Sequence, residues 1–312
     1  MKAKTIKAVL RKKIDDWISS IEDPDVAELV QANAIVTGGA IASMLLKEPV
    51  NDYDVYFRDK ATVVAVAAYY IKRFKPKNAS GIACQIYLLT EGDRVRVVIQ
   101  SAGIASEAGT EKPYEYFEGS PDEASQGYVS DVMLTDPGEI QDTYEDTEKA
   151  VQEIEDGPKY RPVFMSTNAI TLSHKIQIVL RFYGEADQIH ENYDYVHCTN
   201  YWTSKDNELV LRGPALEALL AKELRYVGSK YPLCSLIRMR KFIQRGWSIN
   251  AGQILKAVMQ LNDMDLKDIS VLQDQLTGVD AAYFIQVMQR LKEKDPEKVN
   301  SAYLIEIIDR MF

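Results

Sequence analysis

The chain of 312 residues carries a formal net charge of −9, with 46% hydrophobic and 9% aromatic residues. These values are typical of a globular protein of one large or two modest domains, and its apolar runs are too short for a membrane span. Its first residues lack the apolar core of a signal peptide, and the three cysteines (Cys84, Cys198 and Cys234) are far apart, which excludes a disulfide framework and a CxxC-type zinc site. We therefore expect a cytoplasmic protein with no membrane partner.

One segment carries most of the negative charge. Between Glu107 and Asp156 there are 16 acidic residues and 2 lysines, a local balance of −14. The remainder of the chain is mildly basic, at +5, which leaves binding to a nucleic acid open. We expect the acidic segment to be a solvated excursion from the fold.

The first part of the chain alternates helical and strand patterns. Apolar residues recur at helical spacing within 5–31, where a turn at 23–25 separates two helices. Residues 91–93, Glu-Gly-Asp, are a good hairpin turn. In chain order we expect helices within 5–31, a strand at 34–37, a helix at 40–47, a strand at 52–57, a helix at 61–74 and a hairpin of 83–89 with 94–99.

The later segments differ from this first part. Residues 101–161 are rich in Gly, Pro, Ser and acidic residues and predict an insertion, and the chain after 214 has helical spacing throughout. The fold class is therefore expected to be α+β, with a small mixed sheet in a first domain at 1–212 and an all-helical second domain at 213–312. The other expected elements are strands at 175–182 and 193–199 and helices at 215–227, 233–244, 252–261, 265–276, 281–292 and 301–311.

The strongest local pattern is a strand that enters a helix through Gly38-Gly39 and is followed by Asp52 and Asp54. The backbone N–H groups and the positive helix end at such a turn suit a phosphate. Residues i and i+2 of a strand face the same way, so the two carboxylates would point together and would repel each other without a cation such as Mg²⁺. Either feature alone is more often a tight turn or a capped loop, whereas their combination in this order favours a phosphate-and-metal site.

In this pattern the chain resembles the DNA polymerase β-type nucleotidyltransferase superfamily, and residues 38–46 look like the opening motif of poly(A) polymerases and CCA-adding enzymes. That family has Arg-Asp where this chain has Ala42-Ser43. The resemblance implies a nucleotidyltransferase head, template-independent transfer of a nucleoside monophosphate to an RNA 3′ end, and a mechanism with two Mg²⁺ or Mn²⁺ ions.

A second resemblance concerns the helix at 233–244, which with the residues around it looks like the family's neck helix. Its apolar residues occupy one side, and four basic residues are available to phosphates: Arg238, Arg240, Lys241 and Arg245. An ordinary amphipathic helix with a solvated basic face is the alternative interpretation.

A third resemblance concerns Asp194, which lies between tyrosines and fits the superfamily's third carboxylate on a neighbouring strand. A buried or capping aspartate is the alternative. His190 and His197 lie near in sequence but do not indicate a zinc site.

The resemblance assigns roles to ten residues. The catalytic and metal-binding set is Asp52, Asp54 and Asp194; the nucleotide-binding set is Gly38, Gly39, Ser43, Arg238 and Lys241; and the RNA-binding set is Arg240 and Arg245. Two rival hypotheses stay open: a nucleotidyltransferase that modifies a protein, a small molecule or, as a toxin, tRNA, and a non-catalytic binding protein that retains the fold.

Overall fold

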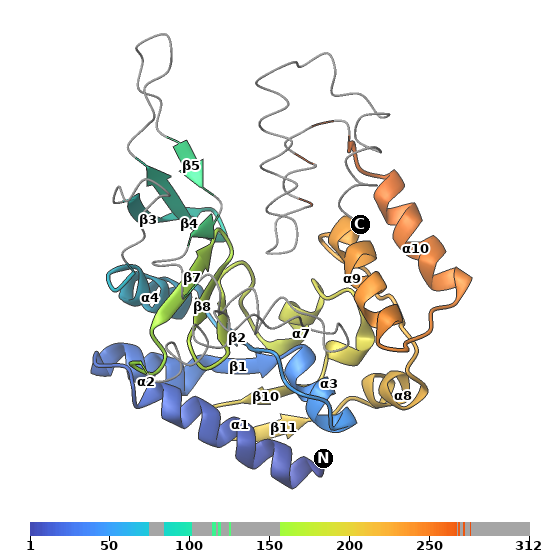
Figure 1. Cartoon of the computed structure of the whole chain (residues 1–312), viewed down its shortest axis with the longest axis horizontal. Helices are drawn as coiled ribbons and strands as arrows, with labels where there is room; N and C mark the ends of the chain where they lie inside the picture. The colour runs from blue at the N-terminus through green and yellow to red at the C-terminus, as the bar shows by residue number, and fades with distance from the viewer. Residues whose placement is uncertain are drawn as a thin grey trace, which may run out of the picture.

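A computed structural model describes residues 1–74, 84–101 and 157–266, with short stretches between 114 and 125 and between 268 and 275. Helices pack on a mixed sheet, and a group of helices lies beside one end of it (Figure 1). The helices are α1 (Ala3–Ile18), α2 (Pro24–Asn33), α3 (Gly39–Leu46), α4 (Lys60–Ile71), α7 (Ala186–His190), the 3-10 helix η2 (Val196–Cys198), α8 (Gly213–Ala221), α9 (Pro232–Gln244) and α10 (Ala251–Asn262). The strands are β1 (Ala34–Thr37), β2 (Tyr53–Phe57), β3 (Cys84–Glu91), β4 (Arg94–Ser101), β5 (Tyr114–Tyr116), β6 (Glu118–Gly119), β7 (Pro162–Ser166), β8 (Ala169–Leu172), β9 (Ile176–Val179), β10 (Tyr201–Thr203) and β11 (Glu208–Val210).

Local sequence explains where the first helices begin and which side they bury. The carboxylate of Asp23 accepts hydrogen bonds from the backbone N–H groups of Asp25 and Val26 at 3.1 and 3.3 Å, and Pro24 occupies the first turn of α2. The buried residues of α1 recur every three or four positions and form one stripe: Ile6, Leu10, Ile14 and Trp17.

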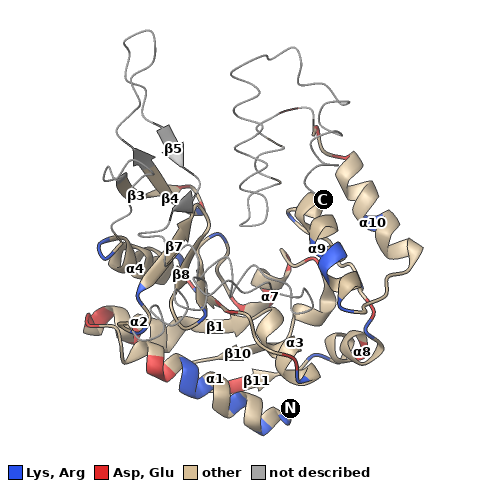
Figure 2. Cartoon of the chain, in the orientation of Figure 1, with Lys and Arg blue, Asp and Glu red and all other residues tan. Residues whose placement is uncertain are grey.

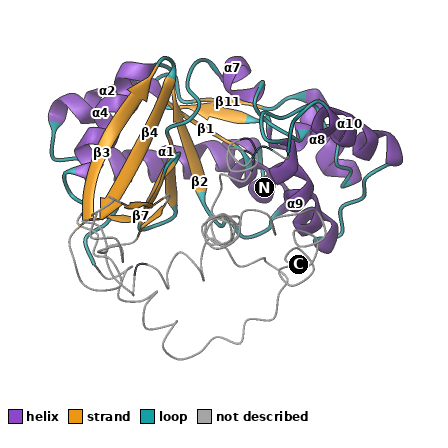
Figure 3. Cartoon of the chain, turned by 90° about the horizontal axis from the view of Figure 1, so that it is seen from above, coloured by secondary structure: helices purple, strands orange, loops and turns teal. Residues whose placement is uncertain are grey.

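Within the described residues, the main sheet has the strand order β11-β10-β1-β2-β9-β8-β7-β6. Strand β1 pairs antiparallel with β2 and β10, whereas β2 pairs parallel with β9, so the sheet is mixed. Strands β3, β4 and β5 form a separate antiparallel sheet, which Figure 3 shows on the side of the molecule away from α8–α10. The expected α+β class is confirmed, although the main sheet is larger than the small sheet we expected.

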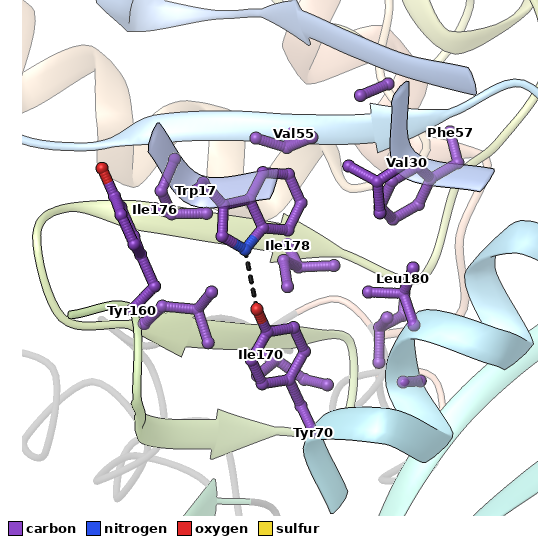
Figure 4. Close-up of a cluster of buried hydrophobic side chains, with 14 of the residues drawn as sticks. Trp17, Val30, Val55, Phe57, Tyr70, Tyr160, Ile170, Ile176, Ile178 and Leu180 are labelled. Carbon is purple, nitrogen blue, oxygen red and sulfur yellow. Dashed lines mark hydrogen bonds between the residues drawn. The ribbon is translucent and has the colours of Figure 1, made fainter. Parts of the chain in front are cut away.

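One face of the main sheet is covered by α1, α2 and α4 through a continuous apolar core (Figure 4). At its centre the indole Nε1 of Trp17 donates a hydrogen bond of 2.7 Å to the hydroxyl of Tyr70, which satisfies both buried polar groups. Val55 and Phe57 of β2 are fully buried in this core. Because side chains alternate along a strand, Asp54 and Tyr56 point to the opposite face.

A smaller apolar cluster joins the end of this sheet to the helices beside it. It is built from α3, the segment before η2, α8, the stretch after α8, α9 and α10. Its buried members are Ala42, Tyr195, Leu219, Leu224, Tyr226, Met239, Trp247 and Ala257. Among the described helices, none combines the length and apolarity that crossing a membrane requires.

The expected strand at 193–199 is wrong. This segment forms a turn and then η2, in which the backbone N–H groups of Cys198 and Thr199 donate to the carbonyls of Tyr195 and Val196. Only Tyr195 makes a sheet-like contact, an isolated bridge to Tyr226. The alternating apolar residues of this segment are therefore buried in a turn and not in a strand.

The expected helix at 215–227 is too long. Helix α8 ends at Ala221, and Lys222 adopts a left-handed conformation with φ of 47°. Beyond it the backbone N–H of Leu224 donates to Ser248, and that of Val227 donates to Asp194. These long-range partners replace the helical ones.

Other expected elements have mixed outcomes. The helices at 233–244 and 252–261 are confirmed as α9 and α10, and the earlier elements of the first 101 residues are confirmed with small shifts of their ends. Six of the described strands were not expected: β5, β6, β7, β8, β10 and β11. The acidic insertion and the helices at 281–292 and 301–311 lie largely or wholly outside the described residues, as does most of 265–276.

Candidate active site

The glycine turn and the Asp54 carboxylate meet at the end of β1. In the β1–β2 pairing Thr37 lies opposite Asp54, so the residue after Thr37 passes directly over the carboxylate. Gly38 has φ of 93° and ψ of −150°, and a Cβ atom there would lie 2.7 Å from Oδ2 of Asp54. Both the backbone conformation and the space therefore require glycine.

Gly39, the first residue of α3, differs from Gly38 in having room beside it. No heavy atom lies within 4 Å of the position of its Cβ. The backbone N–H groups of the first turn of a helix have no partner within the helix, and they make its start favourable for an anion. Ser43 lies half-buried one turn further along α3. Open space thus lies beside Gly39, the residue that follows the glycine passing over Asp54.

The charge of one candidate metal ligand, Asp52, acts on the other, Asp54. Burial raises the pKa of Asp54 well above its ordinary value, the neighbouring charge of Asp52 raises it further, and the guanidinium of Arg238 opposes both. A buried carboxylate beside a second one carries an unfavourable negative charge that a divalent cation relieves. Hard oxygen ligands of this kind fit Mg²⁺ or Mn²⁺, with Asp52 and Asp54 as the residues that would hold the ion.

The carboxylate of Asp194 is held by two hydrogen bonds. Its Oδ2 accepts a hydrogen bond of 2.7 Å from Nε of Arg238, and its Oδ1 accepts one of 3.0 Å from the backbone N–H of Tyr195. In the part of the chain that the structure describes, no three His, Cys, Asp or Glu side chains are grouped to hold a metal. The contact that the structure gives this carboxylate is with Arg238, and the metal-binding role of Asp194 stays a prediction. Its segment turns into η2 instead of running as a strand beside β2.

Arg238 of helix α9 carries a positive charge that acts on the carboxylate site. The positive charge of Arg238 opposes the raised pKa of Asp54 and also that of Tyr56 on the same strand. Since Asp194 is only 13% exposed while Arg238 is 44% exposed, the buried partner holds the exposed one in place. Asp194 thus holds the guanidinium whose charge also acts on Asp54.

The other basic residues at α9 differ in how far they are exposed to solvent. Arg245 lies seven residues after Arg238, two turns along the helix. Burial lowers the pKa of His197 to about 4; the charge of Asp194 opposes this effect and that of Arg245 adds to it. Arg240 is exposed and Lys241 is half-buried. Of the pair assigned to RNA, Arg240 is exposed and Arg245 is half-buried, and their role stays a prediction.

A buried polar layer below the carboxylates was not expected from the sequence. Thr37 Oγ1 lies 2.8 Å from Nε2 of His190 and donates to the carbonyl of Asn200 at 2.9 Å. The ring of Tyr193 packs on His190 with centroids 4.9 Å apart, and burial raises the Tyr193 pKa. Burial lowers the pKa of His190 to about 4, so this histidine is neutral at neutral pH. These residues come together only because distant segments of the chain pair, and no local sequence pattern predicts that pairing.

Ala42 stands where the resembling family has arginine, and it is only 5% exposed. It packs in the cluster with Tyr195, Met239 and Trp247, at the junction of α3 and α9. The position is therefore filled by an apolar contact, and Arg238 is the guanidinium that the structure brings to the carboxylates.

A family model for Gabija anti-defense 2 proteins matches residues 8–222, more than half of the chain. The chain belongs to the Gabija anti-defense 2 family. The matched region contains the glycine turn, Asp52, Asp54 and Asp194, and it ends before α9 begins. A curated relative, "Gabija anti-defense 2" of Bacillus phage SPbetaL7, is 20% identical over 123 residues, which are 39% of this chain and 31% of that protein. The alignment thus spans about a third of the relative's length.

Two solved structures resemble the chain at low similarity. The Thermotoga maritima CCA-adding enzyme complexed with tRNA has a TM-score of 0.36 and 12% identity, and covers 90% of this chain and 56% of its own. The Bacillus stearothermophilus CCA-adding enzyme in complex with CTP has a TM-score of 0.35 and 12% identity, over 86% of this chain and 50% of its own. The chain spans about half the length of these enzymes, and at such TM-scores the likeness decides neither fold family nor activity.

The carboxylate pair predicts a thermal shift with divalent ions. Addition of Mg²⁺ at neutral pH is expected to raise Tm by several degrees, because a ligand at a hundred times its Kd stabilises the folded state by about 2.7 kcal/mol. Without a divalent ion, stability is expected to fall as pH rises from about 3.9, the ordinary aspartate value, toward the raised pKa of Asp54. Over that interval the folded chain keeps a proton that the unfolded chain has lost. Differential scanning fluorimetry across pH, with and without Mg²⁺, measures both effects.

Asp54→Asn is the matched variant for this measurement, because it removes the charge and keeps the shape. It is expected to lose both the Mg²⁺ shift and the pH dependence. An equal Mg²⁺ shift in Asp54→Asn would place the ion elsewhere.

Proposed function

We propose that this chain is a metal-dependent nucleotidyltransferase that acts against Gabija defence. The observation that carries the proposal is the contact between the Gly38 turn and the buried Asp54 carboxylate, with Asp52 beside it. A phosphate approach and a cation site at one point suit a nucleoside triphosphate. The sequence resemblance to polymerase β-type nucleotidyltransferases supports the same chemistry, and the family match supports the biological setting.

In the proposed reaction, an acceptor hydroxyl oxygen attacks the α-phosphorus of the triphosphate. The bond between the α-phosphorus and the bridging oxygen breaks, pyrophosphate leaves, and the hydroxyl proton passes to solvent. Divalent ions held by Asp52 and Asp54 would supply charge neutralisation at the phosphates and activation of the hydroxyl. The N–H groups at the start of α3 orient the phosphates, and Asp194 positions Arg238 to contact them.

Two acceptors are considered. An RNA 3′ end is the one that the sequence resemblance implies. A protein component of the defence is the second candidate, which the anti-defence setting of the family suggests.

The test incubates the chain and Mg²⁺ with each α-labelled nucleoside triphosphate and either total RNA or protein extract from cells carrying Gabija. Label that is sensitive to ribonuclease supports the RNA 3′ end, and label that is sensitive to protease supports a protein acceptor. Absence of transfer with every triphosphate and both extracts would favour a non-catalytic protein that retains the fold.

A further inference from the structure

The side chain of Tyr193 lies on the face of the main sheet that carries Asp54. Val55 points into the core that α1, α2 and α4 cover, so Asp54 and Tyr56, its neighbours along β2, point to the opposite face. The ring of Tyr193 packs against that of Tyr56 on this opposite face, with ring centroids 6.0 Å apart. Tyr193 and Asp54 therefore share one side of the sheet.

Helix α7 determines where the ring of Tyr193 lies. The backbone N–H of Tyr193 donates to the carbonyl of His190, the last residue of α7, at 3.1 Å. The two rings also meet in a T-shaped arrangement, with centroids 4.9 Å apart. Ile189 of α7 is fully buried in a cluster with Ile35 and Tyr56, against which Tyr193 packs. The place of the tyrosine hydroxyl is thus fixed by packing of its ring.

This hydroxyl lies beside the Asp54 carboxylate. A Cβ atom at Gly38 would lie 2.7 Å from Oδ2 of Asp54 and 3.5 Å from the hydroxyl oxygen of Tyr193, so both atoms border the same point of the glycine turn. The hydroxyl oxygen is buried, and among the described residues no group makes a hydrogen bond of ordinary geometry with it. The hydroxyls of Tyr56 and Thr37 approach it without such geometry. A buried donor thus stands next to the candidate metal ligand.

A donor of this kind suits a carboxylate that holds a cation. A buried hydroxyl without a well-formed hydrogen bond is unfavourable and therefore rare in folded proteins. Carboxylates that bind metals are themselves held by protein donors, which fix their orientation. Arg238 of α9, a helix whose basic residues Figure 2 shows, acts on Asp54 with a positive charge and so opposes a bound cation. The hydroxyl of Tyr193 is neutral and can hold the carboxylate without that opposition.

We propose that Tyr193 is a positioning residue of the cation site, whose hydroxyl donates a hydrogen bond to the Asp54 carboxylate when Asp54 holds a divalent ion. The inference rests on the proposed function, because it takes Asp54 as a ligand of that ion. Tyr193 acts through Asp54 by fixing the direction of its oxygens. Loss of such a donor lowers metal affinity by about 10- to 100-fold in metal sites of known structure.

The test measures binding of Mg²⁺ alone, with no triphosphate present. Tyr193→Phe removes only the hydroxyl, and Tm is measured over a Mg²⁺ series, from which the dissociation constant follows. The variant is expected to bind Mg²⁺ about 10- to 100-fold more weakly than the parent. Without Mg²⁺ its Tm is expected to equal or exceed that of the parent, because no well-formed hydrogen bond is lost.

Tyr70→Phe is the matched control. It removes the hydroxyl of another buried tyrosine, but this hydroxyl accepts a hydrogen bond of 2.7 Å from Nε1 of Trp17. The control is expected to lower Tm without Mg²⁺, since the buried indole N–H loses its partner, and to keep the parental affinity for Mg²⁺. The two variants thus differ in both measured quantities.

A second measurement gives the affinity without unfolding the chain: titration with Mn²⁺, in which electron paramagnetic resonance reports the free ion. Parental affinity for both ions in Tyr193→Phe, or equal weakening in Tyr70→Phe, would overturn the positioning role. Weaker binding in Tyr193→Phe alone would support it even if no triphosphate is transferred. Absence of ion binding by the parent would instead refute the cation site of the proposed function, and this inference with it.

Discussion

Asp54→Asn is expected to lower nucleotidyl transfer by at least about a thousandfold while the chain stays folded. Metal ions bound by such carboxylates contribute several kcal/mol of transition-state stabilisation, and each 1.36 kcal/mol is a factor of ten in rate. The fold is expected to survive because burial and the charge of Asp52 already disfavour the ionised form of Asp54. Removal of that charge relieves repulsion and desolvation. The measurement is initial rate of label transfer at saturating Mg²⁺, together with Tm.

Asp263→Asn is the matched control, because it makes the same chemical change at an exposed residue at the end of α10. It is expected to keep parental activity. Retention of more than about a tenth of the activity in Asp54→Asn would refute its role as the metal ligand, since a lost ligand costs far more.

Gly38→Ala and Gly39→Ala are expected to fail in different ways although they are neighbours. A Cβ at Gly38 would lie 2.7 Å from Asp54 Oδ2 in a backbone region that only glycine occupies readily, which costs about 1–3 kcal/mol before the clash is counted. Gly38→Ala should therefore lose stability and displace the carboxylate, with loss of transfer. Gly39→Ala meets no atom within 4 Å, so its stability should be unchanged or slightly higher.

The added methyl group of Gly39→Ala would nevertheless occupy the approach to the start of α3. It is expected to raise KM for the triphosphate on the order of tenfold, equivalent to about 1.4 kcal/mol, with a smaller change in kcat. Thermal melts and steady-state kinetics of both variants test this pair. Parental kinetics in a folded Gly39→Ala chain would mean that the phosphates do not approach there.

The local part of the site could be predicted from the sequence because its signals are local. The strand that ends at Thr37, the glycine turn and the start of α3 are adjacent in the chain, and Asp54 lies in a short apolar strand directly after. Their meeting follows from one antiparallel pairing, β1 with β2. Sequence spacing alone was sufficient for that step.

The partners of Asp194 could not be predicted in the same way. Its segment has the apolar–polar alternation of a strand, but the backbone hydrogen bonds of the segment are those of η2 and one from Val227 to the carbonyl of Asp194. The carboxylate of Asp194 accepts a hydrogen bond from Arg238 of α9, 44 residues away. The buried layer of Thr37, His190 and Asn200 likewise depends on contacts over more than 150 residues. No periodicity encodes such contacts.

Which side of α9 packs against the rest of the chain could not be predicted for a related reason. The four basic residues were expected to be available to phosphates; in the structure Arg238 pairs with Asp194, Arg240 is exposed, and Lys241 and Arg245 are half-buried. Which side of a helix packs is decided by its neighbours, here Tyr195 and Trp247, and these lie far from it in sequence or beyond its end.

The fate of each phosphate tests the central claim most directly. The chain is incubated with Mg²⁺, RNA and protein extract and with triphosphate labelled either at the α-phosphorus or at the γ-phosphorus. Nucleotidyl transfer at Asp52 and Asp54 predicts acceptor-bound label from the α-position only, pyrophosphate from the γ-position, and neither with Asp54→Asn. Acceptor-bound label from the γ-position, or α-label transfer that Asp54→Asn retains, would contradict it.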